Sequence, residues 1–145
     1  MRMITALIVL ATPGLAYAAE PNLKATLACE VVEQGKRTKL PAKRLRLEDP
    51  VECKLSVDGA ARPEPFAARL ATSWTDYEGT KAVPKKSERL VGKVNGGAPW
   101  TATLAPDKDF VGCLDFVIEA ALTAPGAEAK PAWSKKIKVK QFCPD

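Results

Sequence analysis

The chain contains no histidine, and this absence excludes several common kinds of catalytic site. A Ser-His-Asp triad and a Cys-His nucleophile both need an imidazole base, and none of the 145 residues supplies one. Zinc sites use histidines or closely spaced cysteines, whereas the four cysteines here are 24, 60 and 30 residues apart. There is also no glycine-rich phosphate loop, since Asn95-Gly96-Gly97 is typical of a hairpin turn.

Carboxylates and lysines remain as candidates for acid–base or metal chemistry, but their placement is unfavourable. In a strand, Asp115 and Glu119 lie about 13 Å apart, too far to share a proton or a water molecule. Asp107 and Asp109 lack the further oxygen ligands of a calcium site, so we expect a solvated turn there. The lysines fall on expected loops and wet faces, which does not suit a general base. We therefore expect no enzymatic activity, no metal and no cofactor.

Long apolar runs are absent after the first residues, which resemble an export signal. Arg2 is followed by a short apolar core, a Pro-Gly breaker and the small residues of a cleavage site before Ala19. This order is typical of a signal peptide, and the apolar core is too short to span a bilayer. We predict a signal peptide over residues 1–18, a single domain over 19–145, and a periplasmic or extracellular location.

Apolar residues alternate with polar ones at short intervals through the rest of the chain. This period of two predicts strands with one buried and one solvated face. The seven expected strands are 23–31, 51–57, 66–74, 90–94, 100–104, 110–122 and 133–139. Seven short strands separated by turn residues predict an all-β fold, a single antiparallel β-sandwich.

Two of these segments also fit a helix, namely 66–74 and 110–122. For the second, pairing with the segment 133–139 favours a strand, because one antiparallel register satisfies both faces. That register places Phe116 opposite Val139, Ile118 opposite Ile137, Leu122 opposite Trp133, Glu119 opposite Lys136, and Asp115 opposite Lys140.

Four cysteines in an exported chain predict two disulfides. Pairing the first two strands places Cys29 opposite Cys53, although it also places Glu30 opposite Glu52. The last two strands bring Cys113 within one residue of Cys143, a gap that a bulge would close. We therefore predict Cys29–Cys53 and Cys113–Cys143. The alternative, Cys53–Cys113 with Cys29–Cys143, contains the inter-sheet bridge of immunoglobulin domains.

The architecture resembles that of immunoglobulin-like domains. The stretches VECKLSVDG, SWTDYEG and DFVGCLDFV follow the order of strands B, C and F in that fold. Val111 stands where such domains have a corner tyrosine, and we transfer no functional residues from the resemblance.

A cluster of basic residues is the main candidate for contact with a partner. It is formed by Lys36, Arg37, Lys39, Lys43, Arg44 and Arg46, within a chain of formal net charge +5. Such a cluster is either a solvated loop and edge or a site for an acidic partner. It contains no aromatic residue for base stacking, so no nucleic acid is expected. Tyr77 is a second candidate contact, whereas the three tryptophans are expected in the core. Lys136, Lys138 and Lys140 form a stripe that either guards an edge or attracts an anionic partner.

These observations predict an exported, non-catalytic binding module whose partner is another protein or an anionic envelope polymer. The alternative is a protein inhibitor of an envelope or extracellular hydrolase, such as a lysozyme or protease, that uses an inter-strand loop such as 77–88. An enzyme of unfamiliar type is the third possibility. We expect no transmembrane segment.

Overall fold

Two antiparallel sheets of four strands each make up the computed structural model, which describes residues 23–42, 48–127 and 129–143. The strand orders are β2-β1-β3-β6 and β5-β4-β7-β8. The strands are β1 (Ala25–Glu33), β2 (Lys36–Lys39), β3 (Val51–Val57), β4 (Phe66–Glu78), β5 (Lys81–Val94), β6 (Trp100–Leu104), β7 (Phe116–Thr123) and β8 (Trp133–Val139). No helix occurs within the described ranges, so 66–74 and the strand part of 110–122 are extended, as predicted.

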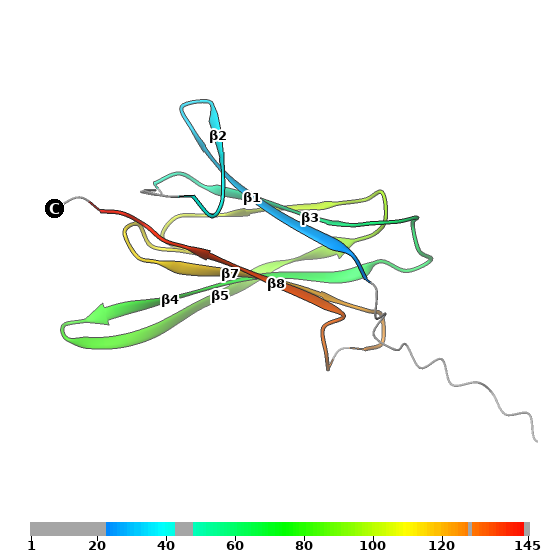
Figure 1. Ribbon diagram of the computed structural model, residues 1–145. Coiled ribbons are helices and arrows are strands. Elements are labelled where there is room, and N and C mark those ends of the chain that lie inside the picture. Colours follow the sequence, from blue (N-terminus) through cyan, green and yellow to red (C-terminus); the bar gives the residue numbers. More distant parts are fainter. Residues whose placement is uncertain (1–22, 43–47, 128, 144–145) are drawn as a thin grey trace, which may run out of the picture.

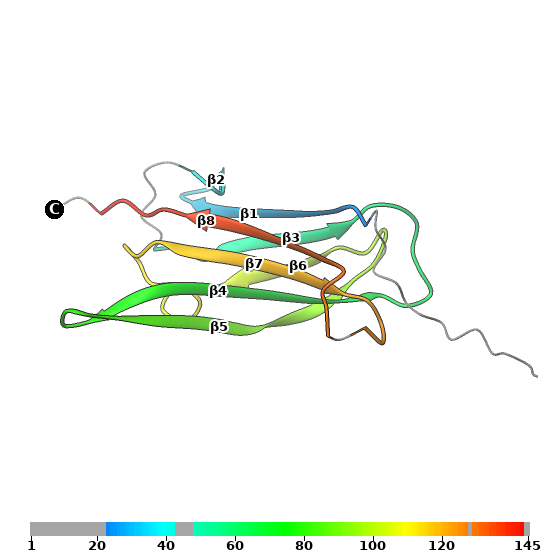
Figure 2. The same cartoon turned by 60° about the horizontal axis from the view of Figure 1, so that its bottom comes forward.

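The two sheets pack face to face as a β-sandwich, and the core lies between them (Figures 1 and 2). Alternate residues of β1, β3, β7 and the first half of β4 point into this core, as the alternation predicts. Phe110 and Phe116 stack within this core, with ring centroids 4.9 Å apart. Trp74, Trp100 and Trp133 pack against the core while staying partly exposed.

Both predicted strand registers are confirmed. Cys29 lies opposite Cys53 in the β1–β3 ladder, and Ile118 lies opposite Ile137 in the β7–β8 ladder. Glu119 and Lys136 form the expected ion pair, with 3.3 Å between Oε2 and Nζ. The predicted disulfides Cys29–Cys53 and Cys113–Cys143 are both present, and the alternative connectivity is wrong.

The prediction of seven strands is wrong by one, because residues 36–39 form the edge strand β2. β1 and β2 are joined by a two-residue turn in which Gln34 and Gly35 both have positive φ, as a type I′ hairpin requires. Arg37 on β2 contacts Glu30 at 3.0 Å and Glu52 at 3.5 Å. The new strand thereby compensates the like charges that face each other across β1 and β3.

Strand β7 begins at Phe116 rather than at residue 110, so the expected pairing of Asp115 with Lys140 is wrong. Residues 111–115 form a turn in which Cys113 has a φ of 70°, and this turn, not a bulge, brings Cys113 to its partner cysteine. The side chain of Gln141 holds the turn by accepting a hydrogen bond from Cys113 N and donating to Val111 O and Leu114 O. Asp115 Oδ1 instead accepts from Gln141 N at 2.8 Å.

Strands β4 and β5 form a long hairpin, which corrects the expectation of an inter-strand loop over 77–88. The ladder runs to Glu78 and Lys81, so only Gly79 and Thr80 turn. β7 pairs with β4 no further than Trp74, and beyond it β4 pairs with β5 alone. Figures 1 and 2 show this β4–β5 arm extending past the strands packed beside it.

Neither disulfide joins the two sheets. One connects neighbouring strands β1 and β3, and the other connects the turn before β7 to the segment after β8. The inter-sheet bridge of antibody domains is therefore not formed, and the immunoglobulin-like topology stays a prediction beyond the sandwich itself. The predicted signal peptide lies outside the described residues.

Candidate functional site

The structure distributes the predicted basic cluster differently from the sequence expectation. Lys36, Arg37 and Lys39 lie on the exposed edge strand β2, whereas Lys43, Arg44 and Arg46 lie outside the described residues. The Arg37 guanidinium is engaged by two carboxylates. The hydrogen bond with Glu30, followed by the charge of Glu52, raises the pKa of Arg37 above its ordinary value. Arg37 therefore has a structural role within its sheet.

The surface beside β2 contains acids as well as bases. A hollow of about 550 Å³ is lined by Glu33, Gln34, Lys36, Thr38, Glu48 and Asp49. Three of these residues are acidic and one is basic, so the described part of this region is not a uniform positive surface. An anion that approached Lys36 would also meet these carboxylates.

Tyr77 lies on the β4–β5 arm and is 62% exposed. It faces Ala82 across the hairpin, close to the turn at Gly79 and Thr80. The arm carries charges of both signs, including Asp76, whose Oδ1 accepts a hydrogen bond from Tyr77 N at 2.8 Å. The structure therefore confirms an exposed tyrosine but places it on a strand, away from β2.

Positive charge is concentrated on the sheet that contains the arm. Strands β4, β5, β7 and β8 contain nine basic and four acidic residues, a net charge of +5. Strands β1, β2, β3 and β6 contain four basic and three acidic residues, a net charge of +1. The two edge strands of the β5-β4-β7-β8 sheet, β5 and β8, both contain more basic than acidic residues. Lys136 and Lys138 of the lysine stripe thus lie on an edge strand, as predicted, and Lys140 follows directly after it.

A groove of about 390 Å³ crosses this sheet. Its lining comes from all four strands and from the residues that flank β7 and β8: Ser73, Trp74, Thr75, Pro84, Lys85, Asp115, Phe116, Val117, Lys138, Val139 and Lys140. Phe116 and Val139 are buried in the core, and the register places Trp74 and Lys85 on their side of the sheet and Ser73, Val117 and Lys138 on the other side. No sequence pattern indicates this groove, because it depends on the order of strands that are distant in the chain.

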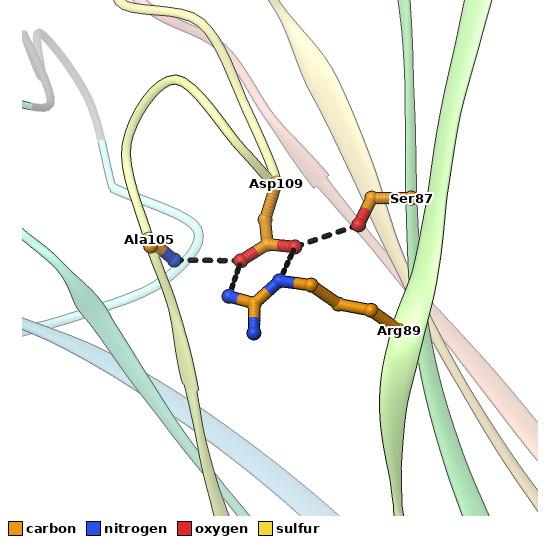
Figure 3. A network of polar contacts seen from close by, with 4 residues as sticks. All are labelled: Ser87, Arg89, Ala105 and Asp109. Atoms are coloured by element: carbon orange, nitrogen blue, oxygen red, sulfur yellow. Dashed lines mark hydrogen bonds and ion pairs between the residues drawn. The ribbon is translucent and has the colours of Figure 1, made fainter.

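Asp109 is a second feature that the sequence reasoning missed, since a solvated turn was expected and the side chain is 1% exposed. Figure 3 shows its carboxylate between Arg89 and Ser87 of β5 and the backbone of Ala105. Arg89 donates two hydrogen bonds to it, Ser87 Oγ donates one at 2.6 Å, and Ala105 N donates one at 2.7 Å. This Asp109 cluster fastens the loop between β6 and β7 to strand β5.

The charge of Asp109 is maintained by these donors. Burial acts to raise the pKa of the carboxyl group, but the hydrogen bonds from Arg89, Ser87 and Ala105, with the charge of Arg89, outweigh it. The pKa of Asp109 therefore lies below its ordinary value. Both carboxylate oxygens of Asp109 accept hydrogen bonds from other groups of the protein. We therefore interpret the Asp109 cluster as structural.

Metal ligands are not gathered anywhere in the described part of the chain, where no three His, Cys, Asp or Glu residues come together as a metal site. All four cysteines are in disulfides, which indicates an oxidising, non-cytoplasmic location. Within the described ranges no helix is long and apolar enough to cross a membrane.

Comparison with known proteins does not assign a function to the chain. No family model matches the chain, and no curated protein matches it.

Proposed function

We propose that the protein is an exported, non-catalytic binding module that captures an anionic partner in the cell envelope or extracellular space. The observation that carries this proposal is the charge difference between the sheets, +5 on the strands of one and +1 on those of the other. A surface of one sign attracts partners of the opposite sign and speeds their association. The binding surface is then the exposed face of the β5-β4-β7-β8 sheet rather than β2.

The test is a capture experiment from envelope extract with the chain purified from the periplasm of an expression host. Reversing Lys138 and Lys140 to glutamate should abolish capture, because both border the groove. Reversing Lys36 and Lys39 changes the net charge equally and should leave capture intact. Raising the salt concentration should also release the partner, since exposed charges are screened. Capture that survives both the reversal of Lys138 and Lys140 and high salt would refute the proposal.

A second candidate function is inhibition of a hydrolase, favoured by the β4–β5 arm with its two-residue tip and exposed Tyr77. A projecting hairpin of this kind suits insertion into an enzyme cleft. Stoichiometric inhibition of a lysozyme or protease, lost on Tyr77→Ala and kept on Lys138→Glu, would support it. No inhibition across a broad panel of such enzymes counts against it.

A further inference from the structure

The two disulfides differ in how far solvent reaches them. Cys29 and Cys53 are 1% and 2% exposed, and they face each other inside the β1–β3 ladder. Cys113 is exposed and Cys143 is partly exposed, and both lie outside the strands. Thiol–disulfide exchange begins when a thiolate attacks a disulfide sulfur, so its rate depends on access. A dissolved thiol can therefore approach the Cys113–Cys143 bridge in the folded chain, whereas the core covers the other bridge.

The backbone around Cys113 is not held by a sheet. Residues 111–115 form a turn in which Cys113 has a φ of 70°. A residue with a side chain rarely adopts this left-handed conformation and keeps it only where its surroundings impose it. Opening the bridge removes one of these constraints, so the turn gains conformational freedom when the two cysteines are reduced.

Reduction of this bridge is expected to be a local event, because the turn is anchored on both sides. Before the turn, the Asp109 cluster fastens the loop after β6 to strand β5. Phe110 and Phe116, which flank the turn, are buried and stack on each other. Neither anchor uses Cys113 or Cys143, and neither disulfide joins the two sheets. The sandwich should therefore stay folded when this bridge opens.

The side chain of Gln141 connects the two cysteine-bearing segments without using either sulfur. Its Oε1 accepts a hydrogen bond from Cys113 N at 2.9 Å. Its Nε2 donates to Val111 O at 2.9 Å and to Leu114 O at 2.7 Å. These hydrogen bonds join the turn to a residue two positions before Cys143. In the dithiol they hold the two thiols close together, which raises their effective concentration for closing the bridge again.

We propose that Cys113–Cys143 is a site of reversible exchange with external thiols, whereas Cys29–Cys53 is a structural bridge. A thiolate attacks Sγ of Cys113, the more exposed cysteine, and forms a mixed disulfide with it. Cys143 leaves as a thiolate and takes up a proton. A second thiolate attacks the external sulfur of the mixed disulfide and releases Cys113, which is protonated in turn. Two external thiols have then become one disulfide, and their two electrons and two protons reside on the two cysteines. This exchange is independent of the proposed anionic partner.

The experiment equilibrates the folded chain, purified from the periplasm of an expression host, with mixtures of reduced and oxidised glutathione. Thiols are then trapped with iodoacetamide and assigned by mass spectrometry. Structural disulfides of exported proteins resist reduction by glutathione, whereas exposed exchangeable ones do not. Cys113–Cys143 should therefore pass from closed to reduced within the range of mixtures, while Cys29–Cys53 stays closed throughout. The proposal is wrong if Cys113–Cys143 stays closed in every mixture, or if both bridges open together.

The local character of the reduction has its own test. Amide NMR shifts between the oxidised and reduced chain should be confined to residues 111–115 and 140–143. The double variant Cys113→Ala, Cys143→Ala should keep the tryptophan fluorescence of the native chain and a cooperative urea transition. A double variant that does not fold would show that the bridge is needed for the fold, which contradicts a role as an exchange site.

The role of Gln141 gives a readout that mere exposure of a disulfide would not produce. The effective concentration of the two thiols follows from the same glutathione titration. In Gln141→Ala it should fall about two- to tenfold, as the loss of one net hydrogen bond implies. Phe142→Ala is the matched control, because Phe142 lies in the same segment and is 55% exposed. The control should change the value less than about twofold. An equal fall in both variants, or none in Gln141→Ala, would show that Gln141 does not position the cysteines.

Discussion

Removing Arg89 should destabilise the fold more than neutralising Asp109, although the two residues form one ion pair. Arg89→Met leaves a carboxylate that is 1% exposed with only Ser87 Oγ and Ala105 N as donors. Breaking a fully buried pair costs about 3–5 kcal/mol. The Arg89 side chain is 46% exposed, so water reaches this side of the pair, and we expect a cost of about 2–3 kcal/mol.

Asp109→Asn keeps a polar group of the same shape and leaves the charge on Arg89, which can turn toward water. We expect a loss of about 1.5–2 kcal/mol, the range for a hydrogen bond to a charged group. Asp107→Asn is the matched control, because it removes a neighbouring exposed carboxylate from the same loop. It should change the free energy of unfolding by less than about 0.5 kcal/mol.

The effect of Asp109 on stability should also depend on pH. Its folded-state pKa lies below the ordinary value of 3.8, so the carboxylate contributes stability that is present above that value. This contribution is lost as pH falls through the folded-state pKa. The difference in unfolding free energy between the native chain and Asp109→Asn should therefore be constant near neutral pH and shrink in acid below the ordinary value.

Urea unfolding followed by tryptophan fluorescence measures these differences at pH 7 and in acid. The expected order of destabilisation at pH 7 is Arg89→Met, then Asp109→Asn, then the Asp107→Asn control. An Asp109→Asn variant as stable as the control, or a deficit that grows in acid, would show that the Asp109 cluster does not hold the loop.

Substitutions at a close contact, an ion pair and a disulfide give three further predictions for stability. Gly92→Ala would place a Cβ 2.3 Å from Nε1 of Trp100, and urea unfolding should show a loss of about 1–3 kcal/mol from overpacking. Glu119→Gln removes an exposed ion pair with Lys136, and the same assay should show a change below about 1 kcal/mol. Replacing both cysteines of the β1–β3 bridge by alanine should cost about 2–4 kcal/mol, measured against the native chain under non-reducing conditions.

The strands that could be predicted from the sequence are those with a buried row. β1, β3 and β7 alternate closely, β8 does so apart from Lys135, and their pairing is constrained on both faces, so even the register of Ile118 with Ile137 followed from the chain alone. Cysteine pairing followed from the same registers. Packing of one face against the core is what makes this local signal strong.

The features that were missed depend on contacts distant in sequence. β2 is four polar residues at an edge, without a buried row to mark it. The outer half of the β4–β5 arm also has no buried row, because there β4 and β5 pair only with each other, beyond the end of β7. Asp109 lies 20 residues from Arg89 and 22 from Ser87, and no local pattern distinguishes it from the exposed Asp107. The one available signal was an aspartate directly before the apolar run that starts at Phe110.

Lysine acetylation footprinting of the chain bound to its captured partner, read by mass spectrometry, locates the binding surface. We expect Lys138 on β8 and Lys140 directly after it to become protected, while Lys39 and Lys54 on the other sheet react as in the free chain. Protection of Lys39 and Lys54 with unchanged reactivity at Lys138 and Lys140 would contradict this expectation.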